Sequence, residues 1–214
     1  GEDDVLQENM IVQVVRGAPP SDVEVSTSES PESEITKRIL PHSVVVHPDD
    51  PEHFVHVVSS TADSIAADRI RSLPCDLKDL GLEVSTGRVV DFRAREHIMD
   101  SPSPTGAPLI YPMHFEQGFV RWPKPTGRKP NAIVDTDATR RLLVPNATYV
   151  LTKRFTTKEE RRRVVAVVLD SGRLPSDVER LGIENHVNYF HARGNGLNLQ
   201  LAKGLAAFLD STLV

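Results

Sequence analysis

Apolar residues recur along the chain with two different periods, and the two periods together predict an α+β fold. Helical spacing predicts a helix over residues 5–15, before a glycine and a Pro-Pro pair that would end it. A second helix is predicted over residues 62–73, where a proline follows. A third is predicted over residues 197–214, with one apolar face formed by Leu199, Ala202, Leu205, Ala206 and Leu209.

Alternating or continuous apolar runs predict a series of strands between these helices. A strand should begin at Leu82 and be turned back at Gly87. Separately, residues 177–181 are predicted to form a short helix. The run 161–169 is almost wholly apolar at its end, so both faces of that strand should be buried. The other predicted strands cover residues 23–25, 44–46, 54–58, 119–122, 147–154 and 186–191. We therefore expect a curved, largely antiparallel sheet with flanking helices.

Length and composition indicate an intracellular protein with two parts. The 214 residues are enough for one large domain or two small ones, and we divide them into an acidic connecting segment over 1–73 and a domain over 74–214. The single cysteine, Cys75, favours a reducing, cytoplasmic location. The longest apolar run, Val164–Leu169, is too short to span a bilayer, and we see no secretion leader, so no membrane partner is expected.

The net charge of −5 is unevenly distributed along the chain. Residues 1–73 hold 14 Asp and Glu against 5 Lys and Arg, a net charge of −9. Residues 74–214 have a net charge of +4, and within 121–163 there are 12 basic and 4 acidic residues. A basic region of this kind favours a polyanionic partner, although a solvated basic surface would have the same composition.

No catalytic or metal-binding motif accompanies these charges. The sequence lacks a Gly-x-Gly-x-x-Gly loop after a strand, a phosphate-binding loop and a Gly-x-Ser-x-Gly elbow. Its clustered histidines match no zinc spacing, and its paired carboxylates lie in a proline-rich turn. The chain is therefore expected to bind a partner rather than to catalyse a reaction.

The basic and amide side chains fit double-stranded DNA as that partner. Phosphate contacts position a duplex, whereas arginine and asparagine match the edges of guanine and adenine. The candidates for phosphate contact are Lys124, Arg128, Lys129, Lys153, Arg154, Lys158 and Arg161. The candidates for base contact are Arg88, Arg93, Arg95, Asn185, His186 and Asn188, and His114 completes the DNA-binding set. Among the aromatic residues, we expect Phe119, Phe155 and Phe190 in the core and Trp122 at the surface.

Six segments together resemble the C-terminal part of an adenine-N6 DNA methyltransferase of a type II restriction-modification system. They are VLQENMIVQVVRG, GLEVSTGRVVDFRAREHI, APLIYPMHFEQGFVRWPK, YVLTKRFTTKEERRRVVAVVL, ENHVNYFHARGNGL and LAKGLAAFLDSTLV, in the order expected for that family. In the family, an N-terminal catalytic domain holds S-adenosylmethionine and an Asn-Pro-Pro-Tyr/Phe motif. This sequence has no such motif, so no catalytic residue is carried over to it.

The resemblance implies a target recognition domain. Such a domain reads the sequence of the duplex and presents it to a catalytic domain that extrudes the target base. On this hypothesis the partners are double-stranded DNA and the catalytic methyltransferase domain of the same polypeptide, against which residues 5–16 would pack. S-adenosylmethionine would bind in that domain, no cofactor or metal would bind in this chain, and the isolated chain would not methylate. The alternatives are a stand-alone nucleic-acid-binding regulator, a protein-interaction scaffold with a basic face, and, more distantly, a hydrolase.

Overall fold

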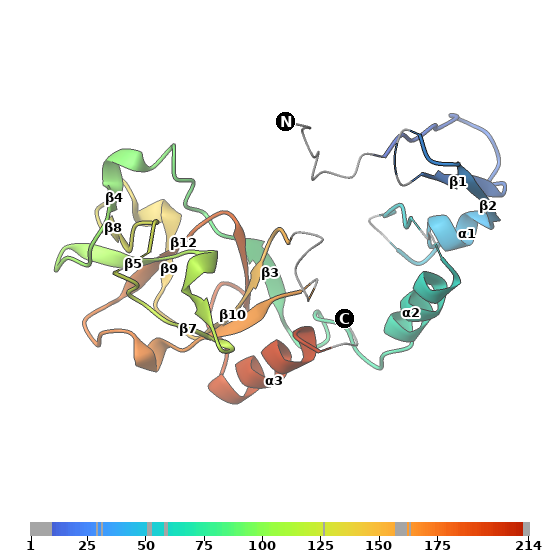
Figure 1. The fold of residues 1–214 in the computed structure, drawn as a ribbon. Helices are drawn as coiled ribbons and strands as arrows, with labels where there is room; N and C mark the ends of the chain where they lie inside the picture. Colours follow the sequence, from blue (N-terminus) through green and yellow to red (C-terminus); the bar gives the residue numbers. More distant parts are fainter. Residues whose placement is uncertain are drawn as a thin grey trace. The chain divides into compact units, whose positions relative to one another are not determined.

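The computed structural model divides into two compact units, Gly1–Pro74 and Cys75–Val214, and its fold class is α+β, as predicted (Figure 1). It describes residues 10–211 except 29, 31, 51–52, 58–59, 126, 157–161 and 163. Among the described residues, no helix is long and apolar enough to cross a membrane.

The first unit has a small core built on a two-stranded antiparallel sheet. Strand β1 (Val23–Thr27) pairs with β2 (Thr36–Leu40), and the short helix α1 (His42–Val45) follows. Leu40 and Val45 are buried together, and four further valines pack against them. Helix α2 (Thr61–Arg71) confirms the helix predicted over 62–73.

Three predictions for the first unit differ from the structure. Residues 44–46 were expected as a strand, but Pro41 directly precedes α1 and the Val46 N–H donates to the His42 carbonyl, which closes a helical turn. Of the strand predicted over 54–58, only an isolated bridge from Val55 to Val46 forms among the described residues. Residues 10–15 form no helix, and the remainder of the helix predicted over 5–15 lies outside the described residues.

The second unit contains two sheets instead of the one curved sheet expected. The six-stranded sheet has the order β3 (Glu83–Thr86), β13 (Val187–His191), β10 (Tyr149–Lys153), β11 (Ala166–Leu169), β7 (Phe119–Val120), β6 (Phe115–Glu116). The five-stranded sheet has the order β4 (Ile98–Met99), β8 (Ala132–Val134), β5 (Gly106–Ile110), β12 (Arg180–Ile183), β9 (Leu143–Pro145). Pairing is antiparallel except between β11 and β7 and between β12 and β5. Short 3-10 helices cover Arg95–His97, Pro112–His114, Arg140–Leu142 and Ser171–Arg173.

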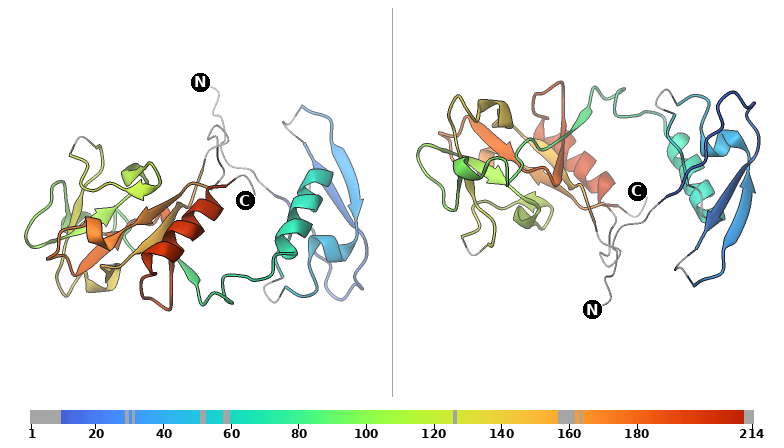
Figure 2. Two further views of the ribbon diagram at one scale, coloured as in Figure 1. Left: turned by 90° about the horizontal axis from the view of Figure 1, so that it is seen from below. Right: turned by 90° about the horizontal axis from the view of Figure 1, so that it is seen from above.

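Helix α3 (Leu199–Leu209) packs against β10 and β11 on one face of the six-stranded sheet (Figure 2). Its buried Ala202, Leu205 and Ala206 lie in one core cluster with Val150 and Val168. The alternate residues of the same strands, Tyr149, Leu151, Val167 and Leu169, join a second cluster with residues of the five-stranded sheet. Strand β11 is therefore buried on both faces, as its apolar sequence predicted. The strand predicted over 161–169 begins only at Ala166, since residues 162, 164 and 165 form no strand and residues 161 and 163 lie outside the described residues.

Residues 177–181 were predicted as a helix, and this prediction is wrong. Arg180–Ile183 form β12, which pairs with β5 on one side and β9 on the other. Leu181 and Ile183 are both buried in the core between the sheets. The partner strands lie far away in the sequence, so local spacing carries no sign of this pairing.

Gly87 lies in a close contact between backbones and does not turn a strand back. Its N–H donates to the Val187 carbonyl, and Val89 pairs with Glu184 immediately afterwards. A Cβ atom placed on Gly87 would lie 2.1 Å from the Glu184 carbonyl oxygen and 2.6 Å from that of Ile183. The missing side chain allows the segment after β3 to run against the end of β12.

Gly87→Ala is expected to lower the free energy of unfolding by about 1–3 kcal/mol, because a backbone carbonyl cannot rotate away as a side chain can. Gly204, within α3, is the matched control, since nothing lies within 4 Å of a Cβ built on it. Gly204→Ala should raise stability by about 0.5–1 kcal/mol. Urea unfolding of both variants checks this. Equal stability of Gly87→Ala and wild type would contradict the close approach.

Candidate nucleic-acid interface

The turn between β12 and β13 gathers polar candidates from distant parts of the sequence. Asn185 donates its backbone N–H to the Val89 carbonyl at 2.9 Å, which places the segment around Arg88 against this turn. Arg154 donates its backbone N–H to the His186 carbonyl at 2.8 Å, and its Nη1 lies 3.5 Å from the Asn185 carbonyl oxygen. We use one name, the β12–β13 turn surface, for Asn185, His186 and Arg154 at this turn and for the exposed Arg88 and Arg93 on the segment that follows β3.

A buried carboxylate holds this turn in place. Glu184 is 2% exposed, and its Oε2 accepts the backbone N–H of His186 at 2.9 Å. Its Oε1 lies 2.5 Å from His186 Nδ1. Sequence reasoning missed Glu184, and the only signal for it was an acidic residue directly after the apolar residues of β12. The carboxylate orients His186 from within, so the outer part of the imidazole remains available to a ligand.

Arg93 belongs to a second turn, which is anchored by the buried Ala94 and by the contacts of Asp91. The Arg93 N–H donates to the Val90 carbonyl, while Ala94 is buried. Asp91 accepts the Tyr111 hydroxyl at 2.8 Å and pairs with Lys129 Nζ at 2.7 Å. Burial, followed by the hydrogen bond to Asp91, raises the pKa of Tyr111 far above its ordinary value, so the hydroxyl remains a proton donor. The anchored turn leaves the Arg93 side chain exposed.

The candidate cations fall into two groups according to their partners within the chain. Lys124 pairs with Glu116 at 3.0 Å, and Lys129 pairs with Asp91. Among the residues that the structure describes, no ion pair forms to Arg88, Arg93, Arg95, Arg128 or Arg154, and all five are exposed. Within the described part of the chain, the second group therefore has no acidic partner that would compete with an external anion.

The remaining candidates lie in different environments. Lys153 is half-buried at the end of β10, and Lys158 and Arg161 lie outside the described residues. The Asn188 side chain is engaged, because its Oδ1 accepts the Thr86 hydroxyl at 3.0 Å. Arg95 begins the first 3-10 helix, two residues beyond Arg93.

The basic loop over 123–130 is fixed by the buried Asn131. The Asn131 Oδ1 accepts the Lys124 N–H at 2.8 Å, and its Nδ2 donates to the Lys124 and Asp100 carbonyls. The Trp122 indole N–H donates to the Asn131 carbonyl at 2.6 Å. Trp122 is therefore half-buried against the core, which corrects its prediction as an exposed residue. Arg128 is the candidate that this loop leaves exposed without an ion pair to any described residue.

His114 was a DNA-binding candidate, but the structure places it in the interior. It is 0% exposed, its Nδ1 accepts the Tyr111 N–H at 3.0 Å, and its Nε2 lies 3.2 Å from Asn131 Oδ1. This pattern requires a neutral ring with its proton on Nε2. His114 supports the loop from inside and does not belong to the surface.

The interior histidine predicts a loss of stability in acid. Burial lowers the pKa of His114 below its ordinary 6.5, and burial acts in the same direction on the pKa of His191. The unfolded chain then binds more protons below about pH 6.5, so unfolding becomes easier as pH falls through that window. The loss should reach at most about 1.4 kcal/mol per pH unit for each histidine. Thermal unfolding between pH 8 and pH 5.5 measures it.

His114→Gln tests the assignment, because glutamine can accept and donate in the same places but does not titrate. The variant should show a shallower fall in stability between pH 8 and pH 5.5 than wild type. An unchanged slope in His114→Gln would show that protonation of His114 does not contribute.

Two of the three phenylalanines predicted in the core lie there, and the third lies at the surface. Phe190 is 7% exposed and Phe119 packs against the same core cluster, as expected. Phe155 was expected in the core, but it is 62% exposed. It follows Arg154 just past the end of β10, beyond the part of the strand that both core layers cover.

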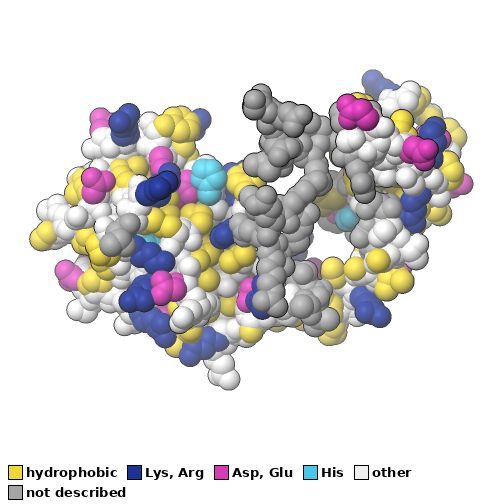
Figure 3. Space-filling model, in the orientation of Figure 1, with side chains coloured by type: hydrophobic (Ala, Val, Ile, Leu, Met, Phe, Trp, Pro, Cys, Tyr) yellow, Lys and Arg dark blue, Asp and Glu magenta, His cyan; other side chains and the backbone are white. Residues whose placement is uncertain are grey.

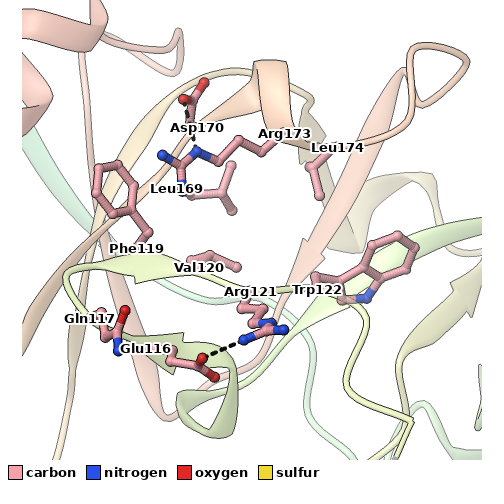
Figure 4. A pocket seen from close by; sticks show the side chains of 10 residues that line it. All are labelled: Glu116, Gln117, Phe119, Val120, Arg121, Trp122, Leu169, Asp170, Arg173 and Leu174. Atoms are coloured by element: carbon pink, nitrogen blue, oxygen red, sulfur yellow. Dashed lines mark hydrogen bonds and ion pairs between the residues drawn. The ribbon is translucent and has the colours of Figure 1, made fainter.

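A cavity of about 360 Å³ lies beside β6, β7 and β11 (Figure 4). Its charged groups are already paired, Arg121 with Glu116 at 2.7 Å and Arg173 with Asp170 at 3.5 Å. Lys and Arg side chains gather over the region of β7 in Figure 3, with acidic ones among them. Among the described residues, no group of three or more His, Cys, Asp or Glu is placed to hold a metal ion.

Comparison with known proteins relates the chain to type II methyltransferases. It is 41% identical over 214 residues to the type II methyltransferase M.PstI of Providencia stuartii, and 37% identical over 214 residues to the type II methyltransferase M.BsuBI of Bacillus subtilis. These alignments include 99% and 100% of the chain, which spans 42% of the length of each relative. No protein-family model and no solved structure matches the chain. The homologues are thus type II methyltransferases, and the chain corresponds to part of them.

Proposed function

We propose that this chain is the part of an adenine-N6 DNA methyltransferase that recognises the DNA sequence, within a restriction-modification system. The observation that carries the proposal is the β12–β13 turn surface, on which Arg154 Nη1 lies 3.5 Å from the Asn185 carbonyl oxygen and the exposed arginines form no ion pair to described residues. The similarity to type II methyltransferases, which extends over nearly all of this chain, supports the proposal. Arginine and asparagine supply both kinds of contact that a sequence-reading surface needs.

In this proposal the chain does not carry out the methyl transfer. This chain spans 42% of the length of its relatives. The catalytic domain and its S-adenosylmethionine would lie in the remaining part of the protein. The chain contributes the position and register of the duplex, so that the target adenine reaches that domain. The whole enzyme would work on DNA in the cytoplasm.

Equilibrium binding to a labelled duplex at increasing salt tests the proposal. Each phosphate neutralised by Lys or Arg releases counterions, so log K should fall linearly with log salt, by about 0.9 for each contact. Unchanged binding between about 50 and 200 mM salt would contradict a phosphate-binding surface. Absence of binding at low salt would refute the proposal.

A further inference from the structure

Phe155 combines exposure with contacts that hold its ring in one place. The ring is 62% exposed and lies directly beside the β12–β13 turn surface. The Arg154 guanidinium lies 5.0 Å from the ring centroid, and the His186 ring packs edge-on with centroids 5.9 Å apart. His186 is itself fixed by the buried Glu184. A single exposed apolar residue is ordinary, but one held between two other side chains, of which His186 is itself anchored, is preorganised.

The charges around Phe155 favour a nucleic acid over an apolar protein surface as its partner. An apolar partner covering the ring would also desolvate Arg154 without offering it a counter-charge. A nucleic acid supplies phosphates for the arginines and flat base faces for the ring. Asn185, whose carbonyl oxygen lies 3.5 Å from Arg154 Nη1, is next to His186 on the same turn.

A regular duplex hides the faces of its bases by stacking, so a ring can meet a base face only where a step has been opened. Apolar side chains of DNA-binding proteins use such openings as wedges. We propose that Phe155 stacks on a base at an opened step of the bound duplex, with Arg154 beside it to neutralise the adjoining phosphate. This inference rests on the proposed function. It further specifies that the surface binds a duplex in which one base step is opened.

The test uses the full chain and two duplexes that differ only by one central mismatch. A mismatch lowers the energy needed to unstack a base, so an inserting residue gives a preference for the mismatched duplex. Wild type should bind the mismatched duplex about tenfold more tightly than the paired one. A difference in affinity of this size is within the range of binding free energy that one base stacked on an aromatic side chain contributes. Phe155→Ala should lose this preference, and Phe155→Trp should keep it.

Phe208→Ala is the matched control, because Phe208 is also exposed, at 41%, but lies on α3. It should retain the wild-type preference, and thermal unfolding should show that both alanine variants are folded. A mismatch preference that persists in Phe155→Ala, or that is absent from wild type, would overturn the inference while leaving the proposed function standing. Failure of wild type to bind either duplex at low salt would refute the proposed function itself.

Discussion

Replacing Arg88 and Arg154 together with alanine is expected to weaken DNA binding about 100-fold at constant salt. Hydrogen bonds to charged groups contribute about 1.5–3 kcal/mol each, and both arginines are exposed with no ion pair to a described residue. If they contact phosphates, the loss should be the same for every duplex sequence. The slope of log K against log salt should also become shallower, by nearly one for each lost contact.

The matched control removes the same two charges elsewhere in the unit. Arg193 and Lys203 are exposed, Arg193 beyond the far end of β13 and Lys203 on α3. The Arg193→Ala/Lys203→Ala variant should bind within a few-fold of wild type, because neither residue belongs to the β12–β13 turn surface and salt screens charges that do not contact the DNA. Equal losses in the two double variants would show that overall charge, not the β12–β13 turn surface, governs binding.

Replacing Arg93 and Asn185 together should relax sequence preference more than it lowers overall affinity. A well-placed two-point contact to a base contributes about 1–3 kcal/mol of discrimination against the wrong base. Loss of two such contacts should reduce the ratio between preferred and unrelated duplexes roughly 30-fold or more. The Asn185 backbone bond to Val89 does not depend on its side chain, so the turn should keep its shape.

Competition binding with preferred and unrelated duplexes measures that ratio. Asn195→Ala/Lys203→Ala is the control, since both residues are exposed and lie away from the β12–β13 turn. Equal weakening toward both duplexes in the Arg93/Asn185 variant would show that these residues contact phosphates. An unchanged ratio with unchanged affinity would remove them from the interface.

Local sequence patterns predicted those helices and strands whose own apolar residues require a buried face. The apolar stripe of α3 and the continuous apolar run of β11 each required a covered surface, and the structure provides one for each. The β10–β11 pair was predictable as a hairpin because its strands are neighbours in the sequence. The class of the fold followed from these strongly periodic segments.

The site depended on contacts that no local pattern encodes. Gly87 was interpreted as a turn because glycine favours turns, but its role is set by carbonyls of Ile183 and Glu184 nearly 100 residues later. His114 is polar and near basic residues, and only the positions of Tyr111 and Asn131 place it inside. Residue type identified the arginines and Asn185 as candidates, whereas their grouping depends on the backbone contacts that the segment after β3 and the end of β10 make with the β12–β13 turn.

Selection from a randomised duplex library with the 214-residue chain tests the central claim most directly. Bound duplexes are sequenced after selection at low and at raised salt. The account predicts enrichment of one short motif, with binding that weakens as salt rises and a motif that disappears in the Arg93→Ala/Asn185→Ala variant. Recovery of unenriched DNA, or no binding at low salt, would contradict a sequence-recognition role for this chain.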